Sequence, residues 1–171
     1  MSFWTQQTLE PKRNFRFKIT SDGWSNTDSV WWWAKSIDKP GYNVTNNEYQ
    51  LINHKFKYPG IVTWNNVQIN LVDFDKEKGG PNSGEALKLE LSKIGYKRPD
   101  QDTPMRGISK IGHSAVSDLI IQHLNADGEP VDTWTLRGAF IIAVSYSRLD
   151  YSGDDISEVT LEVAYDYADY E

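Results

Sequence analysis

The chain has 171 residues, a length that predicts one domain over residues 1–171 with a sizeable hydrophobic core. It contains no cysteine, which excludes disulfides, thiolate metal sites and a cysteine nucleophile. The formal net charge is -6, and residues 149–171 carry 8 acidic side chains and no basic one. No apolar run is long enough to span a bilayer and the start does not resemble a signal peptide, so we expect no membrane span and synthesis in the cytosol.

The first predicted strand covers residues 14–20. Its residues alternate strictly, with Phe15, Phe17 and Ile19 on one face and basic residues on the other. The bulky run 30–34, which contains three consecutive tryptophans, predicts a second strand that is buried on both faces.

The next segments lie on either side of a Pro-Gly turn. Residues 49–58 alternate less cleanly, which indicates a long hairpin or an arm. Residues 61–73 predict a strand, because Val67, Ile69 and Leu71 share one face.

A polar, glycine-rich loop precedes the one predicted helix. Ser83 can cap it, and Leu87, Leu91 and Ile94 follow at helical spacing before Gly95 ends it. Good helix formers fill the intervening positions, which favours a helix over the alternating strand that the leucines would also permit.

The second half of the chain predicts further antiparallel strands. Residues 97–112 form an exposed connection, and residues 114–124 and 131–144 pair as a hairpin around a turn at residues 125–128. Residues 156–167 then alternate as one ordered strand with an acidic face. We therefore predict an α+β fold that is mainly β, an antiparallel two-sheet β-barrel or sandwich with one flanking helix.

We find no group of residues that predicts catalysis. The three histidines, His54, His113 and His123, lie in no motif that sets metal geometry, and nucleophile elbows, P-loops and dinucleotide fingerprints are missing from the sequence. We expect no catalytic, cofactor or metal residues and conclude that the chain is not an enzyme.

Acidic and aromatic residues remain as candidate functional residues. Carboxylates four apart on a strand lie ~13 Å apart, too far to share one bond in hydrolysis, so a charged face is the better interpretation. Four tryptophans are candidates for core or subunit contacts: Trp31, Trp33, Trp64 and Trp134. Trp31 and Trp33 could also stack side by side as a platform for a sugar.

Three groups of residues together resemble a known family. They are Phe15–Ile19, then Tyr58–Gly60 with Trp64 and the strand Val67–Asp73, and a C-terminal block of residues 133–141, 149–151 and 157–167. In order and spacing these groups are similar to the tail tube proteins of contractile-tailed phages, the inner tube subunits of contractile injection systems.

The resemblance implies a structural role and a set of partners. Members assemble as stacked hexameric rings around a channel for the genome, so we expect the chain to bind itself, the tail sheath protein, and the baseplate and tail terminator proteins. DNA would pass through without specific binding. The expected location is the virion tail, assembled in the host cytoplasm. Because cationic walls would hold phosphates, an acidic lumen suits this role, and we expect Glu158, Glu162 and Asp166 to face it.

Two other functions remain open from the sequence. A tube initiator at the baseplate, or the inner tube of a related contractile injection device, would use the same fold. A carbohydrate-binding module is the alternative from a different class, and the tryptophan cluster is the feature that favours it.

Overall fold

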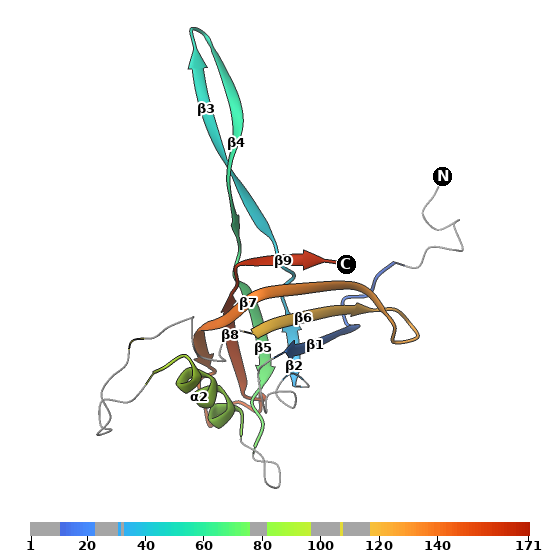
Figure 1. Cartoon of the computed structure of the whole chain (residues 1–171). Helices are drawn as coiled ribbons and strands as arrows, with labels where there is room; N and C mark the ends of the chain where they lie inside the picture. The colour runs from blue at the N-terminus through green and yellow to red at the C-terminus, as the bar shows by residue number, and fades with distance from the viewer. Residues whose placement is uncertain (1–10, 23–30, 32, 76–81, 97–106, 108–116) are drawn as a thin grey trace.

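The computed structural model describes residues 11–22, 31, 33–75, 82–96, 107 and 117–171. Its elements are β1 (Phe17–Asp22), β2 (Ala34–Ile37), β3 (Tyr42–Leu51), β4 (His54–Trp64), β5 (Val67–Val72), α2 (Ser83–Lys93), β6 (Ser117–Leu124), β7 (Pro130–Tyr146), β8 (Glu158–Ala164) and β9 (Tyr167–Tyr170). Seven strands are connected in the order β1-β6-β7-β8-β5-β2, with β9 on β7, and β3 and β4 form a separate hairpin (Figure 1). All paired strands run antiparallel.

The long strand β7 belongs to two sheets. Its first half pairs with β6 on one side and β9 on the other, whereas residues 140–146 pair with β8. Between the halves Gly138 has φ +65°, a left-handed conformation that favours glycine. We call β1, β6, β9 and the first half of β7 the first sheet, and β2, β5, β8 and residues 140–146 the second sheet. Strands of the two sheets run in different directions (Figure 1).

The core lies against one face of the second sheet. Every second residue of β5 and β8 is fully buried, and these residues are Val67, Ile69, Leu71, Val159, Leu161 and Val163. They pack with Ile19 of β1, Leu119 of β6 and Leu136 of β7. Full burial of each such side chain contributes about 1.5–3 kcal/mol, so this alternation is the main source of the fold's stability.

The predicted helix is present as α2, which covers the core beside β7. Asn82 is the N-cap, and its Oδ1 accepts a hydrogen bond from the Glu85 amide at 2.7 Å. Ser83, the cap expected from the sequence, is instead the first helical residue, and its buried hydroxyl contacts the Asp73 carboxylate. Ala86 and Leu87 are the buried apolar residues of the helix.

The hairpin of β3 and β4 projects away from both sheets (Figure 1). The register shifts between Val44 and Asn46, where the Thr45 hydroxyl accepts a hydrogen bond from the Ile61 amide at 2.7 Å. A Cβ on Gly60 would lie 2.3 Å from that hydroxyl, so only glycine fits this position without movement. The long hairpin or arm expected from the sequence is therefore present, and its strands extend beyond residues 49–58.

Several predicted strands have other bounds in the structure. The predicted strand 61–73 is wrong as one element, because residues 61–64 belong to β4 and β5 begins only at Val67, after two asparagines that belong to neither strand. The predicted strand 30–34 is also wrong: Trp31 has a helical backbone, and β2 begins at Ala34. The expected connection 97–112 lies outside the described residues apart from Gly107.

The predicted hairpin in the second half is confirmed. β6 and β7 pair antiparallel around a turn in which the Asn125 Oδ1 accepts hydrogen bonds from the amides of Asp127 and Glu129, both at 2.9 Å. In its described residues the chain has a mainly β fold with two antiparallel sheets and the flanking helix α2, which agrees with the predicted fold class.

Candidate functional site

The face of the second sheet that points away from the core is polar. On β8 the buried residues alternate with Glu158, Thr160 and Glu162, which are partly exposed. The pairing register places the corresponding residues of neighbouring strands beside them. We call this surface the polar face; it comprises Lys35, Ser36, Gln68, Asn70, Ser145, Glu158, Thr160 and Glu162.

Side chains of the polar face bind one another. One row of residues in register crosses the sheet from Ser36 through Asn70 and Thr160 to Ser145. The Thr160 hydroxyl donates to the Asn70 Oδ1 at 2.9 Å, and the Asn70 amide donates to the Ser36 hydroxyl at 3.0 Å. This face therefore satisfies much of its own hydrogen-bonding capacity without a ligand.

The structure brings together two of the three predicted acidic residues. Glu162 accepts a hydrogen bond from the Asn66 amide at 2.8 Å, and Glu158 forms an ion pair with Lys35 of β2. Asp166 does not share the polar face, because β8 ends at Ala164 and the chain bends before β9. The prediction of one unbroken strand over 156–167 is thus wrong, since residues 167–170 must leave β8 to pair with the first half of β7.

The four candidate tryptophans occupy different environments. Trp31 is buried, and its indole N–H donates to the Ser21 hydroxyl at 2.8 Å. Trp33 is 43% exposed and stacks on Phe74 with ring centroids 5.5 Å apart. Because Trp31 lies in the core, the two cannot form the side-by-side platform that the sequence allowed.

Trp64 and Trp134 each pack where two elements of the chain meet. Trp64 lies 5.3 Å from the Tyr42 ring and 6.0 Å from the Tyr165 ring, measured between centroids, at the base of the hairpin. Trp134 packs against Tyr170 at 5.3 Å, which holds β9 on β7. Both residues therefore stabilise junctions between elements of this chain.

The second sheet ends in two strands whose outer edges pair with no described residue. These open edges are β2 and residues 140–146 of β7. The Ser147 amide donates to the Glu158 carbonyl at 2.9 Å, so by alternation the backbone groups of Val144 and Tyr146 point away from β8, toward the open edge.

The opposite edge has the same arrangement. The Asp38 amide donates to the Gln68 carbonyl at 2.9 Å, and the Trp33 carbonyl accepts from the Val72 amide at 3.0 Å. The backbone groups of Ala34 and Ile37 therefore point toward the open edge of β2. On both edges the outward backbone groups belong to residues whose side chains face the core side of the sheet.

A charged cluster around the buried Asp132 ties the segment before β1 to β7 and β9. The Asp132 carboxylate accepts hydrogen bonds from Lys12 and, at 2.8 Å, from the Tyr170 hydroxyl. The Lys12 ammonium holds the pKa of Asp132 below its usual value, a lowering that burial opposes and the Tyr170 hydroxyl supports. His123 lies beside it, with Nδ1 3.7 Å from the carboxylate and Nε2 donating to the Arg13 carbonyl at 2.8 Å.

Sequence reasoning missed this cluster, although a signal was available. His123 and Asp132 are direct partners in the β6–β7 register. The predicted hairpin around residues 125–128 already places the two side chains on the same face, nine residues apart in the chain.

Among the described residues, no group of three or more His, Asp or Glu side chains gathers as a metal site. His54 is exposed on the hairpin and packs edge-on against Phe56 at 4.7 Å, and His113 lies outside the described residues. In the described part of the chain, no helix has the length and apolar character needed to cross a membrane.

Comparison with known proteins identifies the fold. No protein-family model and no curated protein sequence matches the chain. A chain of the sheath–tube complex of the extracellular contractile injection system PVC, in its extended state, matches with a TM-score of 0.65 and 15% identity over 100% of this chain and 98% of that one.

Two other solved structures give the same result. A chain of the PVC sheath/tube terminator matches with a TM-score of 0.66 and 15% identity, over 95% of this chain and 98% of the other. A chain of the six-fold symmetrised baseplate of the anti-feeding prophage matches with a TM-score of 0.65 and 13% identity, over 95% and 97%. The chain therefore has the fold of proteins that build extracellular contractile injection systems, as its sequence resemblance predicts.

Proposed function

We propose that this chain is the structural subunit of a contractile tail tube and assembles as stacked hexameric rings around a channel. The observation that carries the proposal is the complementarity of the two open edges of the second sheet. The likeness of this chain to a chain of the PVC sheath–tube complex supports the proposal. The six-fold symmetry of the anti-feeding prophage baseplate structure, which contains another similar chain, supports it as well.

The two edges match in strand direction. The four strands of the second sheet alternate, so β2 and β7 run in opposite directions. Rotation about a ring axis preserves the direction of each strand, and β2 of one copy would therefore lie antiparallel to β7 of the next. A chain of such contacts removes both open edges of the second sheet when the ring closes.

At both edges, the residues that would pair between copies have their side chains on the same face of the sheet. Hydrogen-bonded partners across an antiparallel pair place their side chains on the same face. Ala34 and Ile37 on β2, and Val144 and Tyr146 on β7, all have side chains on the core side. Pairing between copies therefore joins core face to core face and polar face to polar face.

The polar face would line the channel. α2 and the first sheet cover the core side of the second sheet. They form a second layer on that side, and a layer added to a closed sheet needs a larger circumference than the sheet itself. In a closed barrel the larger circumference is outside, so the uncovered polar face points inward. Glu158 and Glu162 are then the lumen carboxylates, and Asp166 is not among them.

The hairpin of β3 and β4 would connect neighbouring rings. Beyond its bulge one face carries Tyr49, Leu51, Phe56 and Tyr58, all at least 43% exposed, and the other carries charged and amide side chains. Such an amphipathic ribbon is a surface that a partner covers.

A proline substitution tests the edge contact. Val144→Pro removes an amide that faces the open edge and leaves the bonds to β8 in place, so it should weaken association between copies by roughly tenfold or more. Val144→Ala is the matched control, because it loses the same side chain but keeps the amide. Sedimentation and negative-stain microscopy should show rings for the wild type and for the control only.

Two outcomes contradict the proposal. If the wild-type protein stays monomeric at high concentration, its edges are not self-complementary. If Val144→Pro forms rings as well as the wild type does, the contact between copies does not use the β7 edge. Single rings that never stack would favour the alternative of a tube initiator at the baseplate, which uses the same lateral contact. Sheath, baseplate and terminator proteins are the further partners that this role implies.

A further inference from the structure

An apolar cleft of about 350 Å³ lies between α2 and the second half of β7. Its apolar lining includes Leu87, Leu91 and Ile94 of α2 and Phe140, Ile142 and Val144 of β7. Leu91 is 42% exposed and Ile142 45% exposed, so no described residue of this chain covers the cleft fully. Contiguous apolar surface of this kind marks an interaction site.

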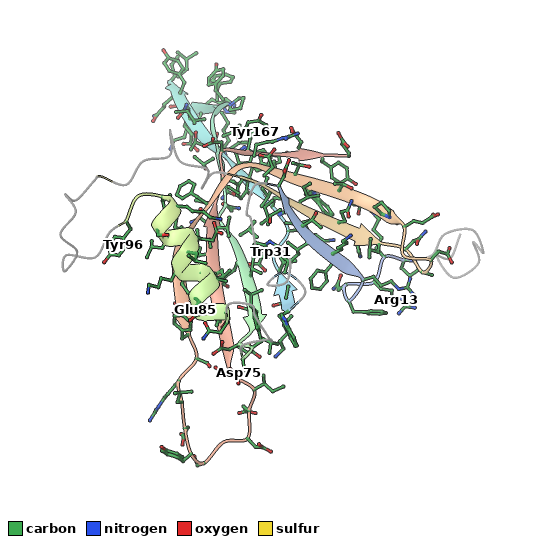
Figure 2. All side chains as sticks on the ribbon, turned by 60° about the horizontal axis from the view of Figure 1, so that its bottom comes forward. Arg13, Trp31, Asp75, Glu85, Tyr96 and Tyr167 are labelled. Atoms are coloured by element: carbon green, nitrogen blue, oxygen red, sulfur yellow. The ribbon has the colours of Figure 1, made fainter. Side chains whose placement is uncertain are left out.

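The cleft lies at one flank of the second sheet, and a different apolar group lies at the other flank. In Figure 2, Glu85 of α2 and Tyr96, just after the helix, lie on one side of the molecule, and Arg13, in the segment before β1, lies on the opposite side. Because α2 adjoins the β7 edge and β1 adjoins the β2 edge (Figure 1), joining those edges between two copies also brings these flanks together.

Phe15 is the exposed apolar residue of the β1 flank. Its side chain is 74% exposed, although the backbone on both sides of it is fixed. The Arg13 carbonyl accepts a hydrogen bond from His123 at 2.8 Å, and the Arg16 carbonyl accepts one from the Leu124 amide at 2.9 Å. A ring held on an anchored segment loses little conformational freedom on binding, which is a property of interface anchors.

The two flanks carry opposite net charge. Residues 11–22 and 33–41, beside the β2 edge, contain six basic and two acidic side chains. Residues 73–75, 82–96 and 147–157, beside the β7 edge, contain three basic and seven acidic side chains. This asymmetry favours contact between the β2 flank of one copy and the β7 flank of another, and it disfavours contact between like flanks.

We propose that the cleft between α2 and β7 receives Phe15 of a second copy of this chain. The inference rests on the proposed ring assembly and adds an outer contact to the strand pairing of the second sheet. Phe15 fills the cleft beside Leu91 and Ile142, and the basic segment that carries it lies against the acidic flank. The contact is head-to-tail, so each copy supplies one Phe15 and one cleft.

Cysteine pairs test the contact cleanly because the natural chain contains no cysteine. The variant Phe15→Cys with Leu91→Cys, treated with a short bis-maleimide linker, should give covalent dimers and higher species up to the hexamer. The matched control is Phe15→Cys with Leu89→Cys. Leu89 is similarly exposed on α2 at 49%, but it lies outside the cleft.

A second variant measures the contribution of the anchor. Phe15→Ala should weaken association between copies by roughly tenfold, whereas Tyr167→Ala, at an exposed position on β9 that belongs to neither flank, should leave it unchanged.

The outcomes separate the two proposals. Rings that form in the wild type, with equal cross-linking of the Leu91 and Leu89 variants or no loss with Phe15→Ala, would overturn the Phe15 contact and leave the ring proposal intact. A wild type that forms no rings would overturn both.

Discussion

At the scale of single residues, Asp132 connects segments that are far apart in the sequence. One of its oxygens contacts Lys12 and the other accepts from Tyr170, so the segment before β1 and the strand β9 meet at one carboxylate. The residue is buried, with 5% of its surface exposed. Replacing the carboxylate by an amide weakens both of these bonds, because hydrogen bonds to a charged group contribute more to stability than neutral ones.

We expect Asp132→Asn to lower the free energy of unfolding by about 2 kcal/mol at pH 7, the typical contribution of hydrogen bonds to a charged group. Urea unfolding followed by circular dichroism measures it. Asp150→Asn is the control: that carboxylate is exposed and bonds to Ser152, so the change should leave the free energy of unfolding close to that of the wild type.

The difference in unfolding free energy between the wild type and Asp132→Asn should depend on pH. The pKa of Asp132 is lowered in the folded chain, so its contribution is fully present above the ordinary aspartate pKa and is lost as pH falls through the folded value. The stability difference between wild type and Asp132→Asn should therefore shrink between about pH 5 and pH 2. A difference that stays constant over this range would contradict the role of the charge.

At the scale of elements, the hairpin is built differently from the sheets. Every residue of β3 is exposed, and the strand pairs only with β4. A two-stranded ribbon is marginally stable alone, so exposed aromatic residues on one face indicate burial against a partner. The ion pair between Lys55 and Glu48, at 3.3 Å, lies on the opposite face.

We expect Tyr49→Ser with Phe56→Ser to abolish the stacking of rings while single rings still form, because the substitutions remove the apolar face and leave the second sheet unchanged. Electron microscopy distinguishes rings from tubes. Gln50→Ser with Lys57→Ser, on the polar face of the same ribbon, should retain tubes. Normal tubes from the first variant would show that this face is not the ring-to-ring contact.

At the scale of the whole molecule, the distribution of charge suits a conduit. On the polar face Lys35 compensates Glu158, whereas Glu162 bonds to a neutral amide, so the face keeps a negative excess. The Asn70 side chain also bonds to Ser36 and to Thr160 across the strands. A wall of this kind offers phosphates no uncompensated cation.

Reversing these charges should make assembled tubes retain double-stranded DNA. Glu158→Lys with Glu162→Lys places three lysines per copy on the polar face, and retention should fall steeply with added salt, as counterion release requires. Gel shift and filter binding measure it. Asp127→Lys with Glu129→Lys, in the exposed β6–β7 turn, makes the same change of charge elsewhere. Equal DNA retention by the two variants would remove the lumen assignment.

Alternation in the sequence was enough to predict the mainly β fold, the β6–β7 hairpin, the helix and the buried faces of β5 and β8. These are local features, since a period of two or of 3.6 records which side of an element is apolar. The side of β8 that carries Glu158 and Glu162 follows from the same rule. Periodicity does not report where a strand changes partners, and for that reason Asp166 was predicted to lie on the same strand as Glu158 and Glu162.

Only the tertiary structure decided which strands form the edges of the second sheet. That result depends on the bend of β7 at Gly138, on the transfer of residues 167–170 to the first sheet, and on Trp31 entering the core in place of a strand. Each is a contact between residues far apart in the chain, which local propensity does not encode. The match in direction and facing between β2 and β7 emerges from those long-range pairings, and the proposed ring rests on it.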